Sequence, residues 1–301
     1  MISAALVHWN CPADQSRRFD AERAFGHLRR LVLMGPRVPG EPAHEQAERY
    51  ISRHLEASGF HVIRQNFSRY APLLNRTIRF TNIIGIANPG APEKVLLTCH
   101  WDTRPIADRD PNAANRSRPI PGANDGASGV AVLLELASVL HDSPTSRCVC
   151  LVFFDGEDLG QGGRPDEFCY GSRHFAAEIP AACRPVRAAV NIDMVGDADL
   201  TLPREGFSVL HASDLTDAIW KIGTKRYPEH FLWNVGPAVY DDHMPLLEAG
   251  LSAVNIIDFN YPAWHTMDDD VARCSPRSLK IVGDVLLEWL GLPEPWERRG
   301  K

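Results

Sequence analysis

Short apolar runs alternate along this chain with longer segments in which apolar residues recur every three or four positions. The short runs, several rich in β-branched or aromatic residues, predict strands, and the periodic segments predict amphipathic helices. Strands are expected at 60–67, 77–86, 94–99, 148–154, 187–192, 207–211 and 251–258. Helices are expected at 20–34, 42–58, 130–140, 213–226 and 275–290, with shorter ones starting at Tyr170 and after Asp241-Asp242-His243.

This alternation of strands and helices predicts one α/β domain, because such sequences form mostly parallel sheets with helices on both faces. No internal repeat, low-complexity linker or break in composition divides the 301 residues. We therefore expect a single three-layer α/β/α domain over 1–301, built on a central mixed, mostly parallel sheet. Residues 1–20 are interpreted as a lead-in segment.

Composition excludes several classes of function. The formal net charge is −6, the isoelectric point is near 6.1 and there is no run of Lys or Arg, so a nucleic-acid partner is not expected. No apolar run approaches the roughly 18 residues that a membrane span needs. The first eight residues show no signal peptide. The protein is expected to be periplasmic or secreted if a leader has been removed, and cytoplasmic otherwise.

Seven cysteines are scattered along the chain. Cys99, Cys148 and Cys150 lie in predicted strands, where a free cysteine behaves as a small hydrophobic residue. The spacing of Cys148 and Cys150 does not fit a redox or zinc pair, and both side chains would face the same side of one strand. We interpret these cysteines as packing residues.

The predicted strand 148–154 is followed directly by the acidic sequence Asp155-Gly156-Glu157-Asp158. Gly156 permits a sharp turn, and in open α/β sheets ligands bind at the carboxyl ends of strands. Two adjacent carboxylates can then divide their roles, one holding a metal while the other moves protons. An isolated Glu-Asp pair is more often a solvated turn, so this interpretation depends on other parts of the chain.

Further polar side chains follow other predicted strands. His100, Asp193 and His265 come after three of them, and Asp125 opens a helix within the glycine-rich segment 122–129. Nitrogen and oxygen donors of this kind suit zinc, and a catalytic zinc leaves one position open beyond three protein ligands. The long loop 103–121 also belongs to a class that is usually functional in compact domains.

Seven segments then carry a resemblance to a known family. In order they are His100–Asp102, Gly122–Gly129, Phe153–Asp158, Tyr170–His174, Asn191–Gly196, Asp241–Leu246 and Trp264–Asp269. With them the chain resembles the glutaminyl cyclases (glutaminyl-peptide cyclotransferases) of bacterial type, within the superfamily of M28 zinc aminopeptidases. The resemblance covers about residues 25–290 and is specific through the order and spacing of the segments.

The resemblance implies an activity and a set of site residues. Such an enzyme closes the N-terminal glutamine of a peptide or protein to pyroglutamate and releases ammonia. One zinc would be held by Asp125, Asp158 and His265. Glu157 would act as general base and acid, in a hydrogen-bond network with Asp193 and Asp241. Trp264 and Tyr261 would bind the substrate, with Phe259 as a further candidate for the pocket lining.

Two other functions compete with this interpretation. A two-zinc aminopeptidase would use the same three ligands together with His100 and Asp193. A catalytically silent binding module would have lost ligands, and none is lost here. The sequences around Asp241 and around Trp264-His265 resemble the cyclases more than the peptidases.

The chain departs from the animal cyclases at three points. Its loop 159–164 lacks their second pocket aromatic, Asp158 stands where they have glutamate, and Val130 replaces the partner of Cys99 in their disulfide. We therefore expect a pocket that is open beside Gly160–Gly163, with Trp264 as its main aromatic surface.

Overall fold

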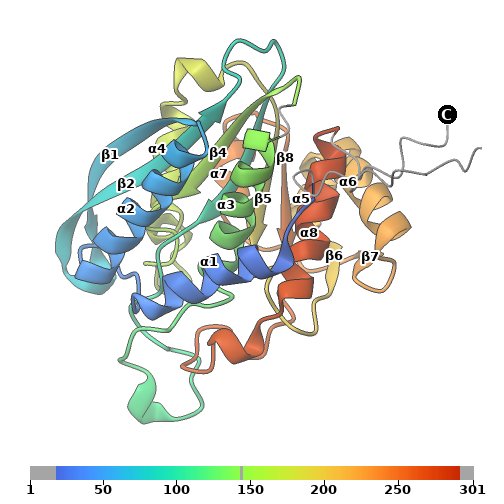
Figure 1. Ribbon diagram of the computed structural model, residues 1–301. Helices are drawn as coiled ribbons and strands as arrows, with labels where there is room; N and C mark the ends of the chain where they lie inside the picture. Colours follow the sequence, from blue (N-terminus) through green and yellow to red (C-terminus); the bar gives the residue numbers. More distant parts are fainter. Residues whose placement is uncertain (1–17, 143–144, 292–301) are drawn as a thin grey trace, which may run out of the picture.

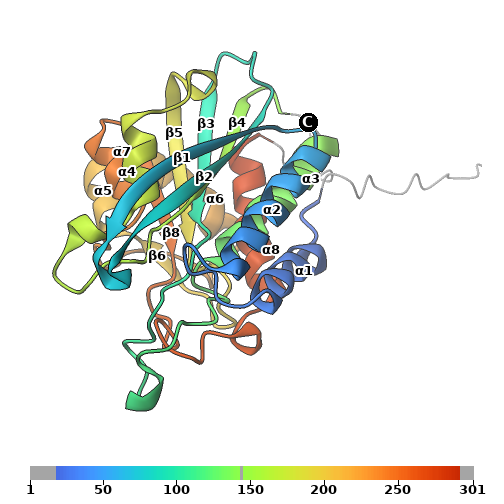
Figure 2. The same ribbon diagram turned by 90° about the vertical axis from the view of Figure 1, so that its left-hand side faces the viewer.

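The computed structural model describes residues 18–142 and 145–291, which build a central sheet between two layers of helices (Figures 1 and 2). Six strands pair in the order β1-β2-β4-β3-β5-β8. Their bounds are β1 His61–Ala71, β2 Arg76–Ala87, β3 Lys94–His100, β4 Cys148–Phe154, β5 Val186–Asp193 and β8 Ala253–Ile257. Strands β4, β3, β5 and β8 are parallel, and β1 and β2 add an antiparallel edge. The predicted mixed, mostly parallel sheet is thus confirmed, whereas most of the lead-in segment (1–17) lies outside the described residues.

Helices cover both faces of the sheet (Figure 2). The first face carries α1 (Ala21–Leu33), α2 (Pro42–Ala57), α3 (Ala127–Asp142) and α8 (Pro276–Trp289), with α6 (Ser213–Arg226) packed against α8. The second face carries α4 (Tyr170–Ala177), α5 (Gly206–His211) and α7 (His243–Glu248). Within the described ranges, no helix has the length and apolar character needed to cross a membrane.

The alternation of side chains along β3 shows why two layers form. Val95 and Leu97 are buried in the core beneath α1, α2, α3 and α8. Leu96 points to the opposite face, where it is buried with Phe175 of α4 and Leu246 of α7. Because successive side chains of a strand face opposite sides, an all-apolar strand needs a helical layer on each side.

The segment 207–211, which we predicted as a strand, is the helix α5. Glu205 caps this helix, since its carboxylate accepts hydrogen bonds from the backbone N–H groups of Phe207 and Ser208 at 2.8 and 2.7 Å. A short apolar run fits a strand and a buried helix equally well, and the cap decides here. The neighbouring strands β6 (Leu202–Arg204) and β7 (Phe231–Val235) form a separate two-stranded sheet that we did not predict.

The interpretation of Cys150 as a free packing residue is wrong, because it forms a disulfide with Cys183, with a Cα–Cα distance of 6.3 Å. Cys183 ends a 3₁₀ turn on the second face of the sheet, where the side chain of Cys150 also points. The partner lies 33 residues away, beyond the reach of a spacing argument. Cys99 and Cys148 are free and buried, as expected of packing residues.

The carboxyl ends of the parallel strands share one edge of the sheet, and long loops meet there. Loop 101–121 (blue-green) and loop 258–275 (red) extend below the sheet in both views (Figures 1 and 2). The two loops are bonded to each other: Arg109 N–H donates to the carbonyl of His265 at 3.2 Å, and Met267 N–H donates to Asp110 at 2.9 Å. The two loops are therefore held to each other.

We expect Gly129→Ala to destabilise the fold by about 1–3 kcal/mol, the usual cost of overpacking. A Cβ at Gly129, in the first turn of α3, would lie 2.7 Å from the carbonyl oxygen of Ile192 and 2.8 Å from Cβ of Cys99. The matched control is Gly26→Ala in α1, where nothing lies within 4 Å of the added atom. That change should stabilise by about 0.5–1 kcal/mol, because alanine is the better helix former. Denaturant unfolding of both variants measures the two effects, and similar effects of the same sign would contradict the packing argument.

Candidate active site and metal centre

The structure brings the five predicted metal-binding side chains together at this edge of the sheet. His100 and Asp193 are the last residues of β3 and β5, and Asp158 follows β4. Asp125 lies just before α3, and His265 lies in the loop after β8. They form two groups in which three side chains can offer ligand atoms within 4.8 Å of one another. Asp125 belongs to both groups.

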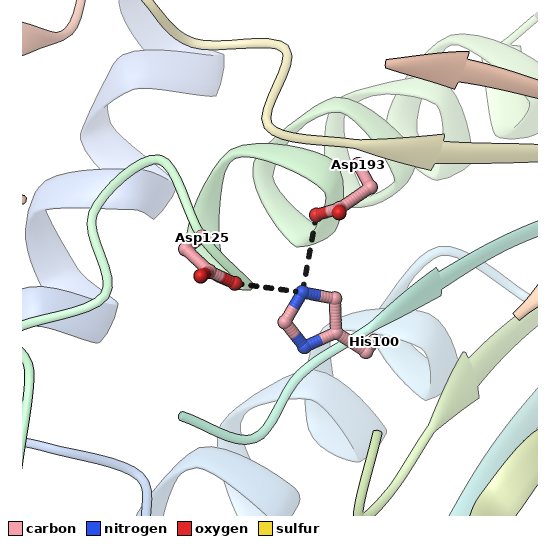
Figure 3. A group of neighbouring side chains, drawn as sticks. All are labelled: His100, Asp125 and Asp193. Carbon is pink, nitrogen blue, oxygen red and sulfur yellow. Dashed lines mark hydrogen bonds and ion pairs between the residues drawn. The ribbon is translucent and has the colours of Figure 1, made fainter. Parts of the chain in front are cut away.

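Figure 3 shows the first group, His100, Asp125 and Asp193. Nε2 of His100 lies 3.1 Å from Oδ1 of Asp193 and 3.2 Å from Oδ1 of Asp125. His100 is 1% exposed, and burial alone would lower its pKa. The surrounding carboxylates, Asp193 first, raise that pKa well above its usual value.

The second group is Asp125, Asp158 and His265. Nε2 of His265 lies 3.3 Å from Oδ2 of Asp158 and 3.6 Å from Oδ2 of Asp125. Asp125 thus turns one oxygen to each group. Oδ2 of Asp158 is buried and has no hydrogen-bond donor within residues 18–142 and 145–291. Buried polar atoms are normally paired, so this oxygen is suited to an ion.

The turn after β4 is held by Asp102, two residues beyond the end of β3. Its Oδ1 accepts a hydrogen bond from the N–H of Glu157 at 3.1 Å, and its Oδ2 accepts one from the N–H of Asp158 at 3.3 Å. Gly156 takes φ 75°, so the sharp turn expected at this glycine is present. One buried carboxylate therefore fixes the backbone of both acidic residues.

Asp269 fixes the backbone of the segment before α3 in the same way, through hydrogen bonds from backbone N–H groups. It accepts hydrogen bonds from the N–H groups of Asn124 and Asp125 at 2.8 and 3.2 Å, and from the hydroxyl of Tyr261 at 2.8 Å. Burial and the nearby Asp125 raise the pKa of Asp269 to about 7. Tyr261, which we expected in the substrate pocket, does not line the cavity described below. Its buried ring supports Asp269 instead.

The long loop contributes two residues that the sequence analysis did not identify. Arg104 donates to Oδ1 of Asp158 at 2.8 Å and, through two nitrogens, to Asp108 at 2.7 and 3.0 Å. Oδ1 of Asp108 lies 3.3 Å from Nδ1 of His265. A carboxylate facing Nδ1 favours a proton there, so Nε2 is the ring nitrogen turned towards Asp125 and Asp158 as a ligand. Only the length of the loop indicated its importance from sequence.

These contacts set the charges of the second group. Burial raises the pKa of Asp158, but the opposing effects of His265 and Arg104 are larger, so the pKa is lowered. For His265, burial lowers the pKa, and Asp158 and Asp108 together raise it to about 9. Asp158 is therefore ionised and ready to bind a cation.

A cavity of about 360 Å³ opens above these groups. Glu157, Asp193 and Asp241 all line it. Burial, followed by the charges of Asp158 and Asp241, raises the pKa of Glu157 well above its usual value. Burial and Asp193 raise the pKa of Asp241 to about 6. Such perturbed carboxyl groups in a cavity are candidates for proton transfer.

In the described part of the chain no direct hydrogen bond joins these three carboxyl groups, so the expected hydrogen-bond network among them stays a prediction. Asp241 is held instead by two amides, because Nδ2 of Asn191 and Nδ2 of Asn255 donate to its Oδ2 at 3.1 and 2.6 Å. Glu157 accepts a weak hydrogen bond from the thiol of Cys169, with Sγ 3.7 Å from Oε1. The three carboxyl groups therefore influence one another through their charges.

Four aromatic side chains line the cavity: Phe168, Tyr240, Phe259 and Trp264. Trp264 thus lines the cavity together with three further aromatic side chains. A Cβ at Gly160 would lie 1.9 Å from the ring of Phe168, so the glycine makes room for this ring. Loop 159–164 itself has no aromatic residue, as stated above, and Phe168, which follows the loop, supplies one to the cavity. The glycine-rich side of the cavity, at Gly162 and Gly163, is present as predicted.

The donor set of the second group fits zinc. Two carboxylates and one imidazole nitrogen are usual ligands of a catalytic zinc, which keeps a further position open to the cavity. The neighbouring Glu157, with its raised pKa, can accept and return a proton beside such an ion. Together these groups can activate a carbonyl and transfer a proton next to it.

Comparison with known proteins agrees with this chemistry. The profile of peptidase family M28 matches residues 82–290. Glutaminyl-peptide cyclotransferase of Bos taurus is 27% identical over 304 residues, which cover 88% of this chain and 81% of the relative.

Solved structures resemble the whole described fold. The glutaminyl cyclase of Porphyromonas gingivalis is 32% identical, with a TM-score of 0.87 and coverage of 91% of this chain and 98% of its own. A Zn-dependent exopeptidase from Parabacteroides distasonis ATCC 8503 is 29% identical, with a TM-score of 0.87 and the same coverage. The chain belongs to peptidase family M28 and, within it, to the glutaminyl cyclases.

Proposed function

We infer that the protein is a zinc-dependent glutaminyl-peptide cyclotransferase. It converts the N-terminal glutamine of peptides or proteins to pyroglutamate and releases ammonia. The observation that carries this inference is the placement of Glu157, a carboxyl group of raised pKa, beside the Asp125, Asp158 and His265 group in one cavity. The names of the similar proteins support the same activity.

Asp125, Asp158 and His265 would hold one zinc ion. Arg104 and Asp108 orient two of these ligands, since they contact Asp158 and His265 directly. When bound there, the zinc supplies a Lewis acid that polarises the γ-carbonyl of the glutamine. His100 and Asp193 then remain hydrogen-bonded to each other and do not act as ligands.

Glu157 moves the proton in this reaction. The α-amine of the glutamine attacks its own γ-carboxamide carbon, and the C–N bond to the amide nitrogen breaks. Glu157 takes a proton from the attacking amine and gives it to the departing nitrogen, which leaves as ammonia. A raised pKa suits both steps, because the group must accept the proton and also release it.

Asp193 and Asp241 support this role through their charges. Asp241 raises the pKa of Glu157, and Asp193 raises that of Asp241. The amides of Asn191 and Asn255 keep Asp241 in place while it does so. A proton in this cluster belongs to the group rather than to one residue.

The activity is tested by incubating the protein with one peptide that begins with glutamine and one that begins with leucine. Mass spectrometry should show the loss of ammonia from the glutamine peptide without shortening of the chain. The leucine peptide should stay intact. Removal of the first residue from the leucine peptide would instead indicate an aminopeptidase, which would use the His100, Asp125 and Asp193 group for a second metal.

We expect Glu157→Gln to keep the fold and the zinc but to lose activity about 10²- to 10⁴-fold, the usual contribution of a general acid–base group. Asp158→Ala should lose the zinc, because it removes a ligand. Metal analysis of protein purified without chelators should give about one zinc per chain for the wild type and for Glu157→Gln. Equal zinc contents in the two variants would refute the division of roles between the adjacent acids. Two zinc ions per wild-type chain, both needed for turnover, would favour the aminopeptidase.

Trp264 should bind the glutaminyl side chain and donate its indole N–H to the developing oxyanion. Its ring lies 4.0 Å from that of His265, and among the described residues its N–H has no acceptor. We expect Trp264→Ala to lower kcat as well as kcat/KM, with about 10²- to 10³-fold of the loss due to the donor. Trp264→Phe keeps a ring without the donor and should be intermediate. A folded, zinc-loaded Trp264→Ala variant with nearly full activity would show that the residue only packs.

A further inference from the structure

A second cavity, of about 260 Å³, adjoins the active-site cavity. We call it the side cavity. The two share Ile257 and Phe259 as lining residues. They also share one stretch of chain, because Pro237 lines the side cavity and the next four residues, 238–241, line the active-site cavity. The side chains of Ile257 and Phe259 thus lie between the two cavities.

The side cavity is built to receive an apolar group. Its lining includes Pro203, Leu232, Pro237, Ile257 and Phe259. Phe259 is 38% exposed although it is a large aromatic residue, and its ring lies 4.9 Å from that of Trp264. Exposed apolar surface that is concave and lies beside a binding site usually contacts a ligand.

Glu205 is the one ionisable side chain among the residues that line the side cavity. Its charge is already paired with other groups of the protein. Its carboxylate accepts hydrogen bonds from the N–H groups of Phe207, Ser208 and Val239 and lies 3.2 Å from Nε2 of His243. These contacts lower the pKa of Glu205 to about 2, although burial alone would raise it. The carboxylate therefore offers no free charge to a basic ligand. Its bond to Val239 also fixes the stretch of chain that lines both cavities.

We propose that the side cavity binds an apolar side chain of the peptide substrate, from the first or second residue after the N-terminal glutamine. This inference rests on the proposed function. With the glutamine in the active-site cavity, the rest of the peptide must leave along its wall, and an extended chain advances about 3.3–3.6 Å per residue. The next side chains then pass Phe259 and reach the side cavity. The substrates are therefore peptides with an apolar residue close behind the glutamine.

The first test compares kcat/KM for two peptide series, Gln-Xaa-Gly-amide and Gln-Gly-Xaa-amide, where Xaa is Gly, Leu, Glu or Lys. Leucine at one of the two positions should raise kcat/KM about tenfold over glycine, within the range that apolar pockets achieve for small differences in side-chain size. Glutamate and lysine should bring no such gain. If leucine and glycine give equal values at both positions, the proposal is wrong. A wild-type protein that forms no pyroglutamate from any of the peptides would contradict the proposed function instead.

The second test asks whether the preference for leucine over glycine arises in the side cavity. Asn234→Trp places a large ring in the side cavity, which Asn234 lines from strand β7, and should bring the leucine-to-glycine ratio close to one. Val235→Trp is the matched control. It adds the same ring one position along β7, at a residue that lines neither cavity, and should keep the wild-type ratio.

A second variant enlarges the side cavity, so that the result does not depend on whether Asn234→Trp folds correctly. Leu232→Ala removes apolar surface from the same cavity and should also lower the leucine-to-glycine ratio. Both variants are compared by thermal unfolding with the wild type before the ratios are interpreted. A preference for leucine that survives both Asn234→Trp and Leu232→Ala would place the contact elsewhere and overturn the proposal.

Discussion

The burial of many carboxylates at one edge of the sheet is the constraint on which the rest of this structure depends. Asp102, Asp125, Asp158, Asp241 and Asp269 are each 3% exposed or less. A buried charge is costly unless it is paired or hydrogen-bonded. The loops at this edge must therefore bring a partner to each acid.

The partners differ from acid to acid, and this difference gives each acid its role. Asp102 and Asp269 accept backbone N–H groups and fix the turns that carry other residues. Asp158 is paired with Arg104 and keeps its charge. Glu157 has only the weak thiol donor of Cys169, so burial and the charge of Asp158 raise its pKa. The environment thus separates a metal-binding acid from a proton-transferring acid at adjacent positions.

The sequence was sufficient to predict the sheet and the meeting of His100, Asp125, Asp158, Asp193 and His265. This is because parallel strands place their carboxyl ends at the same edge, so polar residues that follow apolar runs must converge there. The length of loop 103–121 also predicted that this loop is functional.

The rest depends on contacts between distant parts of the chain. Arg104 and Asp108 act through Asp158 and His265, and nothing in their local sequence indicates these partners. The same holds for Tyr261 with Asp269, for Phe168 beside Gly160, and for the disulfide of Cys150. The helix α5 was missed because a short apolar run fits a strand or a helix, and Glu205, the cap that decides, is itself held by Val239 and His243 from distant parts of the chain.

The position of Asp102 separates the shape of the acidic turn from its chemistry. The backbone at Glu157 and Asp158 is fixed by a side chain from the neighbouring strand end, and not by the side chains of the two residues themselves. Acids of other lengths, or amides, can therefore occupy these two positions on an unchanged backbone. Substitutions at positions 157 and 158 can therefore change the chemistry of the turn and leave its backbone in place. A substitution at position 102 would instead shift the backbone of both residues at once.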